Sequence, residues 1–226
     1  MRHQCSGFHA ASLLLSRFAD WSLHDYATLD HPSQRAVRET VARLFGTTPK
    51  ALSVGVDDCG LATYAFPLSD VARAFVLLAD PVAATADDPE RARSVGALTR
   101  IRDAMMAFPE MVGGNVALDT TLMRRKPGLI VSKGGAEGLR GIGLLPGARG
   151  PGRPAAGVAV RIEDGDGFAR SNRAVTVEAL AQLEVFSARD LQALALAHQP
   201  IVRAPDGAVA AQVIPDFQLA PISELV

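Results

Sequence analysis

Short strand-like runs joined by glycine turns constrain the fold of this chain most. Residues 53–57 and 63–66 flank a turn at 58–60, and the apolar runs 129–132 and 141–145 flank a second glycine-rich turn. Runs joined this closely pair as hairpins, because a parallel connection needs about a dozen residues or more. Helix-like and strand-like segments also alternate irregularly, which argues against a parallel, doubly wound sheet. The sequence therefore predicts an α+β fold with a mixed or antiparallel sheet and helices packed on it.

Apolar residues at helical spacing and capping residues set the expected helix limits. Pro32 stands in the first turn of the second helix and Gly46 ends it. Ser69 and Asp119 are expected to cap two later helices, and residues 80–88 are expected to form a polar loop. The expected helices cover residues 6–20, 32–45, 69–79, 89–108, 120–125, 174–185 and 189–198, and the expected strands cover 53–57, 63–66, 129–132, 141–145, 157–162 and 208–214.

The composition indicates an ordinary globular protein. The chain has 226 residues, of which 48% are hydrophobic and 21% charged, and we expect a single domain over residues 1–226. A formal net charge of −1 gives no electrostatic basis for binding nucleic acid. No apolar run reaches the roughly 20 residues of a membrane span, and the start lacks the pattern of a signal peptide. We therefore expect no nucleic-acid or membrane partner and a cytoplasmic location.

Two cysteines are candidates for a metal site. Cys5 stands at the start of the first expected helix, where the helix dipole and the N–H groups favour the thiolate that zinc binds. Cys59 lies in the turn after the strand at 53–57, close to Asp57, whose carboxylate is suited to bind a ligand amine. Buried thiols and an acidic hairpin turn are the simpler interpretations of the same residues, since the two cysteines have no zinc-finger spacing.

Lys133 carries the strongest sign of catalysis. It ends an apolar strand and precedes Gly134 and Gly135. A partly desolvated lysine is suited to accept a proton, and glycines let a substrate approach the backbone. The arrangement is similar in kind to the lysine-glycine box of serine β-lactamases and penicillin-binding proteins, which also need Ser-x-x-Lys. No serine of this chain has a lysine three residues on; residues 47–50 come nearest, and we interpret them as a turn.

Six segments, in one order, resemble the rhizobial-type asparaginase II family. They are CSGFHAASLL, HPSQRAV, GVDDCGLATYAFPLSDVARAF, FPEMVGGNVALDTTLM, VSKGGAEGLRGIGLLP and GVAVRIEDGD. The resemblance implies a fold similar to that of serine β-lactamases, a homodimer, and hydrolysis of L-asparagine to L-aspartate and ammonia. It also implies that Lys133 is catalytic and that Cys5 and Cys59 bind Zn²⁺. The residues expected to contact the substrate are Asp57, His9 and Gly134.

The chain departs from this family at two points. The family motif has a lysine, the third zinc ligand, where this chain has Phe8, so zinc affinity is expected to fall, with His9 or water as a partial substitute. The family also has a long segment before this motif, which includes Ser-x-x-Lys. We therefore expect the sequence to lack an N-terminal part, through a misassigned start or a truncated gene. Loss of that part is expected to expose an apolar helix face or sheet edge.

Three functions are compatible with these patterns. The first is an L-asparaginase-family amidohydrolase that is impaired or inactive as this chain. The second is a non-catalytic remnant that binds a ligand or partner, which Phe8 favours because a misassigned start would not change that residue. The third is a β-lactamase-like hydrolase of another substrate; the blocks at 55–60 and 133–138 argue for the amide class instead.

Overall fold

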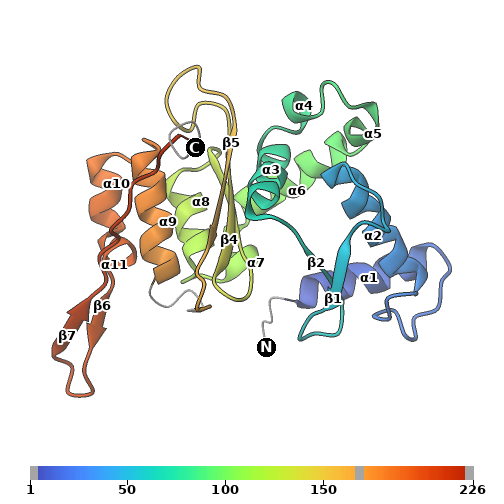
Figure 1. The fold of residues 1–226 in the computed structure, drawn as a ribbon, viewed down its shortest axis with the longest axis horizontal. Coiled ribbons are helices and arrows are strands. Elements are labelled where there is room, and N and C mark those ends of the chain that lie inside the picture. Colours follow the sequence, from blue (N-terminus) through green and yellow to red (C-terminus); the bar gives the residue numbers. More distant parts are fainter. Residues whose placement is uncertain (1–4, 166–170, 222–226) are drawn as a thin grey trace.

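The computed structural model describes residues 5–165 and 171–221 as helices packed on small antiparallel sheets (Figure 1). The helices are α1 (Ser6–Phe18), α2 (Pro32–Phe45), α3 (Leu68–Ala79), α4 (Pro81–Ala84), α5 (Pro89–Ala92), α6 (Val95–Ala107), α7 (Pro109–Gly113), α8 (Leu118–Arg125), α9 (Ser171–Gln182), α10 (Ala188–Ala193) and α11 (Ala195–His198). The strands are β1 (Ser53–Val56), β2 (Ala62–Ala65), β3 (Ile130–Gly134), β4 (Leu139–Leu144), β5 (Ala156–Arg161), β6 (Ile201–Arg203) and β7 (Val209–Gln212). The predicted α+β class is confirmed.

The central sheet has the strand order β3-β4-β5, and each neighbouring pair is antiparallel. Lys133 of β3 stands opposite Gly141 of β4, and Ile142 stands opposite Val158 of β5. β1 and β2 form one separate hairpin, and β6 and β7 form another. The sheet thus arises from consecutive hairpins and short returns, as the spacing of the apolar runs predicts.

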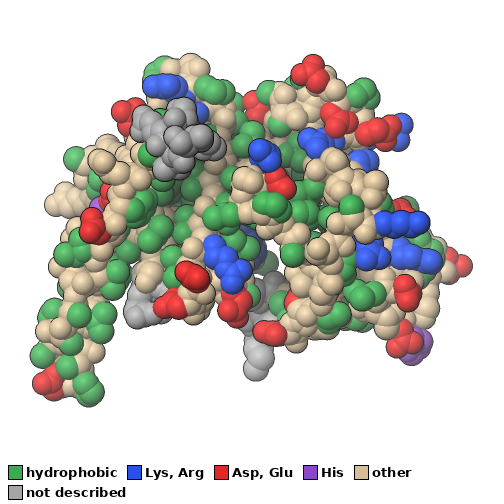
Figure 2. Space-filling view, viewed as in Figure 1, with side chains coloured by type: hydrophobic (Ala, Val, Ile, Leu, Met, Phe, Trp, Pro, Cys, Tyr) green, Lys and Arg blue, Asp and Glu red, His purple; other side chains and the backbone are tan. Residues whose placement is uncertain are grey.

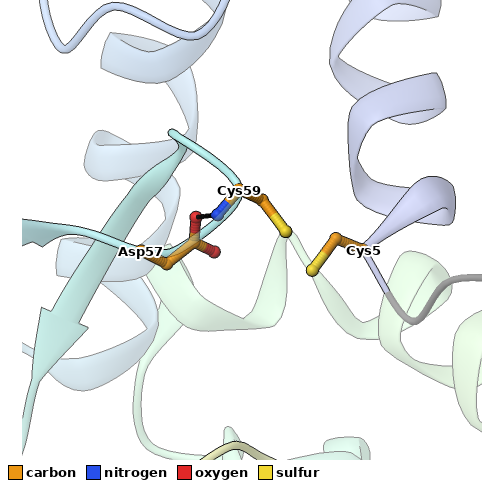
Figure 3. A group of neighbouring side chains, drawn as sticks. All are labelled: Cys5, Asp57 and Cys59. Atoms are coloured by element: carbon orange, nitrogen blue, oxygen red, sulfur yellow. Dashed lines mark hydrogen bonds between the residues drawn. The ribbon is translucent and has the colours of Figure 1, made fainter.

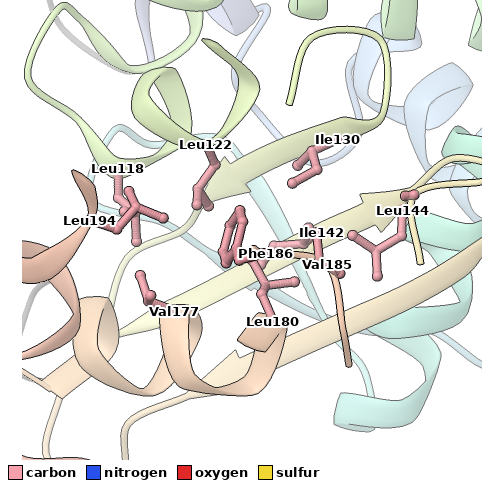
Figure 4. Packing of buried hydrophobic residues seen from close by; sticks show 11 residues of the cluster. Leu118, Leu122, Ile130, Ile142, Leu144, Val177, Leu180, Val185, Phe186 and Leu194 are labelled. Atoms are coloured by element: carbon pink, nitrogen blue, oxygen red, sulfur yellow. The ribbon is translucent and has the colours of Figure 1, made fainter. Parts of the chain in front are cut away.

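The hydrophobic core lies between one face of the central sheet and helices α8 and α9 (Figure 4). Ile130, Ile142 and Leu144 of the sheet belong to one buried cluster with Leu122 of α8 and Leu180 of α9. All five side chains are fully buried, and burial of each such side chain contributes about 1.5–3 kcal/mol. This layer fixes the position of β3, which carries Lys133 at its end.

Helix α3 covers the opposite face of the sheet at glycine positions. A Cβ atom on Gly141 would lie 1.9 Å from the Phe75 ring, and one on Gly157 would lie 1.9 Å from the Ala72 carbonyl oxygen. Both distances are far below van der Waals contact, so only glycine lets the helix approach this closely. β4 therefore presents glycine to α3 and large apolar side chains to the core.

The helix expected over 89–108 is interrupted between α5 and α6, which corrects the prediction of one continuous helix. Arg43 of α2 reaches this break, where its guanidinium donates to the Glu90 carbonyl oxygen at 3.2 Å and to Ser94 Oγ at 2.6 Å. The interruption thus coincides with a tertiary contact that the periodicity of residues 89–108 does not contain.

Three expected features of other helices are also wrong. The loop at 80–88 contains α4, which Asp80 caps by accepting the Ala83 N–H at 3.2 Å. Ser69 and Asp119 each lie one residue inside the helix they were expected to cap, and neither α3 nor α8 has a side-chain cap. The helix expected over 189–198 divides at Leu194 into α10 and α11.

Two further expectations concern turns. Gly46 ends α2 as predicted, in the left-handed conformation with φ +66°. The sequence Asp-Gly-Asp-Gly at 164–167 is typical of a turn, but it extends outside the described residues, which stop at Gly165 before resuming at Ser171.

An apolar face is exposed on α1. An exposed apolar helix face is one of the two features that the sequence predicts. Leu14 and Phe18 lie one turn apart on this helix and are 67% and 91% exposed. Hydrophobic side chains also gather over the β6–β7 hairpin (Figure 2), where Val209 is exposed. None of the helices in the described part of the chain is long and apolar enough to cross a membrane.

Candidate functional site

Three side chains with metal-binding atoms meet between α1 and the β1–β2 turn (Figure 3). Cys5 precedes the first residue of α1, whereas Asp57 and Cys59 lie in the turn that follows β1. One ligand atom from each residue lies within 4.8 Å of the other two. The fold thus brings together the two cysteines that the sequence predicts as a pair, and it adds Asp57 to them.

The Asp57 carboxylate shapes the turn that presents Cys59. Its Oδ1 accepts the N–H of Cys59 at 2.8 Å and the N–H of Leu61 at 3.1 Å. Gly60 has φ +85°, a conformation that side chains disfavour. Asp57 N–H also donates to the Leu61 carbonyl oxygen at 2.9 Å. These bonds hold the Cys59 thiol toward Cys5.

The electrostatic surroundings keep the Cys59 thiol protonated. A hydrogen bond with Cys5 is the main cause that raises the pKa of Cys59 to about 11, and burial adds to it. The negative charges of Asp57 and Asp58 raise the pKa further. A divalent cation would reverse this balance, because it stabilises thiolates.

The donor set fits zinc. Zn²⁺ takes cysteine sulfur and carboxylate oxygen as ligands, and a catalytic zinc site keeps three protein ligands and one open position. Cys5, Cys59 and Asp57 supply two sulfur atoms and one oxygen. The sequence predicts only two protein ligands for zinc, and the structure adds Asp57 as a third candidate. From the sequence, Asp57 is expected to contact the substrate instead.

The two residues that follow in the first motif are placed differently. Phe8 lies on α1 and is 38% exposed, and its ring has no lone pair for a metal. His9 Nδ1 shares a hydrogen bond of 2.7 Å with the Tyr26 hydroxyl, and the two rings meet edge to face at 5.8 Å. His9 is thus engaged with Tyr26, and its predicted contact with the substrate stays a prediction.

Lys133 and Gly134 lie at the end of β3. The half-buried Lys133 points to the same sheet face as its partner Gly141, because opposite residues of antiparallel strands share a face. Its Nζ donates a hydrogen bond to the Gly134 carbonyl oxygen. Ser132 points to the other face, toward α8.

A buried polar network behind Lys133 was missed by the sequence interpretation. Asp119 of α8 accepts hydrogen bonds from Ser132 Oγ at 2.5 Å and from Arg140, whose guanidinium also pairs with it as an ion. Arg140 Nε donates to Asn172 Oδ1 at 3.0 Å. Burial lowers the pKa of Arg140, and the Asp119 charge opposes this shift. A signal existed in the sequence, since Arg140 interrupts a strand of small and apolar residues.

A sequence model of the family described as L-asparaginase II matches residues 1–215. The chain belongs to the L-asparaginase II family. A comparison with curated proteins gave no match.

Membership of the L-asparaginase II family sets the chemistry at a coarse level. The chain is an asparaginase-family amidohydrolase by descent, and a family of this kind has a small-molecule amide as substrate. Both candidate regions, the Cys5–Asp57–Cys59 group and the end of β3, lie within the matched residues.

Proposed function

We propose that this L-asparaginase II family chain forms part of a site that hydrolyses the side-chain amide of L-asparagine to L-aspartate and ammonia. The observation that carries the proposal is the convergence of Cys5, Asp57 and Cys59 in a chain of this family. The convergence joins a carboxylate, which suits the α-ammonium group of an amino acid, to a candidate metal site.

Asp57 is the proposed anchor for the substrate ammonium group. Its Oδ1 already accepts two backbone N–H groups, so the carboxylate has a fixed direction. An ionised carboxylate has about four lone-pair sites on two oxygens, so the turn and a ligand can share it. The same geometry allows Asp57 to contact zinc. Loss of its charge would weaken substrate binding in the first role and zinc binding in the second.

Lys133 is the proposed proton acceptor. Its Nζ would accept the proton of the hydroxyl group that attacks the amide carbon, and would later return that proton to the departing ammonia. Gly134 beside it is buried, and its carbonyl oxygen accepts a hydrogen bond from Nζ, so its contact with the substrate stays a prediction. Cys5, Cys59 and Asp57 would hold a zinc ion, which would supply Lewis-acid chemistry when bound.

We further propose that these 226 residues by themselves turn L-asparagine over poorly or not at all. Ser132, the serine adjacent to Lys133, is buried and donates its hydroxyl to Asp119 on the opposite face of the strand. Phe8 cannot replace the lysine of the family motif as a ligand. Phe8 also supports the second candidate function, a protein that binds the amino acid without hydrolysing it.

Ammonia release from L-asparagine by the purified 226-residue protein tests this proposal. We expect release no faster than from a Lys133→Ala variant, with L-asparagine binding retained in the unaltered protein. Turnover that disappears in Lys133→Ala would contradict the impaired state and support Lys133 as the proton acceptor. Absence of both turnover and binding would contradict the proposed function as a whole.

A further inference from the structure

Asp119 contacts both neighbours of Lys133 along β3. One carboxylate oxygen, Oδ1, accepts the hydroxyl hydrogen of Ser132 at 2.5 Å. The other oxygen, Oδ2, accepts the backbone N–H of Gly134 at 3.1 Å. A single side chain from α8 therefore fixes the residue before the lysine and the residue after it.

The pleat of β3 explains why these two bonds direct Lys133. Gly135 N–H donates to the Leu139 carbonyl oxygen at 2.8 Å, so the N–H of Gly134 points away from β4, off the free edge of the sheet. Asp119 accepts hydrogen bonds from that N–H and from the Ser132 hydroxyl on the side of β3 that faces α8. Alternation then sends the Lys133 side chain to the opposite face.

Asp119 is itself held in place by a buried cation. Its side chain is almost completely buried and pairs with the guanidinium of Arg140, which is buried as well. Asn172 accepts from Arg140 and donates its Nδ2–H to the Gly138 carbonyl oxygen at 2.7 Å, which ties the network to the β3–β4 turn. Removal of one member of such a network leaves an uncompensated buried group, so its members act as a unit.

We propose that Asp119 is a positioning residue for Lys133. It holds the backbone of β3 so that Nζ of Lys133 remains at the Gly134 carbonyl oxygen, where the proposed proton transfer begins. This inference rests on the role proposed for Lys133. It differs from a role in stability alone, because it requires that loss of the Asp119 charge affects Lys133 more than other lysines nearby.

The three lysines of the chain supply the test. Acylation of Lys50, Lys126 and Lys133 by acetic anhydride, followed by mass spectrometry, gives a rate for each amine in one experiment. Lys126 is the matched internal control because it is the C-cap residue of α8, the helix that carries Asp119. In Asp119→Asn we expect Lys133 to react severalfold faster, with Lys126 and Lys50 unchanged.

Two outcomes would overturn the inference. An unchanged Lys133 rate would show that Asp119 does not hold the amine, and equal acceleration of Lys126 and Lys133 would show only a loosened helix. If Asp119→Asn does not fold, Ser132→Ala decides, because it removes the hydrogen bonds of the Ser132 hydroxyl with Asp119 and Arg140 and leaves the Asp119–Arg140 ion pair. A smaller acceleration confined to Lys133 in that variant supports the inference. The absence of any acceleration of Lys133 overturns it.

The acylation test is independent of the proposed function. If only Lys133 reacts faster but the protein does not bind L-asparagine, the positioning role of Asp119 is supported and the proposed substrate is contradicted. L-Asparagine binding with no selective effect on Lys133 would reject the positioning role alone.

Discussion

The Cys59 N–H donates to Asp57 Oδ1 at 2.8 Å, so the carboxylate that forms the turn also stands in the group with the Cys59 thiol. One aspartate therefore links the backbone conformation of the turn to the electrostatics of the Cys59 thiol and to the proposed ligand binding. An asparagine at position 57 would keep a carbonyl oxygen for the backbone N–H groups and lose only the charge. This relationship makes the roles of Asp57 separable by experiment.

Zinc binding should depend on both cysteines and to a lesser degree on Asp57. We expect the purified protein to take up one zinc ion, Cys5→Ser to lose it, and Asp57→Asn to bind it more weakly with its fold intact. Metal analysis after dialysis, with circular dichroism as the check of the fold, measures this. Asp58→Asn is the matched control, because Asp58 lies in the same turn outside the donor group. Equal zinc content in Cys5→Ser and the unaltered protein would contradict the site.

Two glycine substitutions should have opposite effects on stability. In Gly157→Ala the new Cβ would lie 1.9 Å from the Ala72 carbonyl oxygen, so α3 must move and the free energy of unfolding should fall by about 1–3 kcal/mol. Gly96 lies in α6 with no atom within 4 Å of an added Cβ, and Gly96→Ala should stabilise the helix by up to about 1 kcal/mol. Urea unfolding measures both. Similar effects of the two changes would contradict the close packing of α3.

The core between the sheet and α8 should respond to loss of volume. Leu122 is completely buried in the main cluster, and Leu122→Ala should lower the free energy of unfolding by about 2–5 kcal/mol. Val116, which is 87% exposed just before the same helix, gives the control, and Val116→Ala should change stability by less than about 0.5 kcal/mol. Comparable losses of stability in both variants would contradict the packing of α8 against the central sheet.

Asp190 should make stability depend on pH in acid. A hydrogen bond from Lys126, whose Nζ lies 2.8 Å from the carboxylate, is the main cause that lowers the pKa of Asp190 from 3.8 to about 2. Because the pKa is lower in the folded state, the contribution is complete above the unfolded value and is lost as the pH falls through the folded value. With allowance for solvent screening we expect about 1 kcal/mol.

Comparison of Asp190→Asn with the unaltered protein by urea unfolding tests this dependence. The stability difference should be largest near neutral pH and should shrink as the pH approaches 2. Lys126→Met, which removes the cation of the same pair, should abolish most of the pH-dependent part. A difference that stays constant with pH would show that the ion pair does not stabilise the fold.

Local patterns in the sequence were sufficient for the elements that local chemistry determines. The antiparallel β3–β4 pair, Lys133 at the end of its strand and the stop of α2 at Gly46 all follow from short apolar runs, helical spacing and turn residues. The resemblance to the family segments also predicts that Cys5 and Cys59 share one site, and their sulfur atoms lie within 4.8 Å of each other.

Long-range contacts account for what the sequence did not reveal. The break between α5 and α6 is contacted by Arg43 from α2, which no pattern within residues 89–108 contains. Asp119 has the local appearance of a helix cap, and its true partners, Arg140 and Ser132, become neighbours only when β3 and β4 pack on α8.

Binding of L-asparagine to the zinc-supplied 226-residue protein, measured by isothermal titration calorimetry, tests the central proposal most directly. We predict saturable binding of L-asparagine, at least tenfold weaker binding by Asp57→Asn because a charge-assisted contact worth roughly 1.5–3 kcal/mol is lost, and unchanged binding by Asp58→Asn. The titration would contradict the proposal if L-asparagine gave no binding, or if Asp57→Asn bound it as tightly as the unaltered protein.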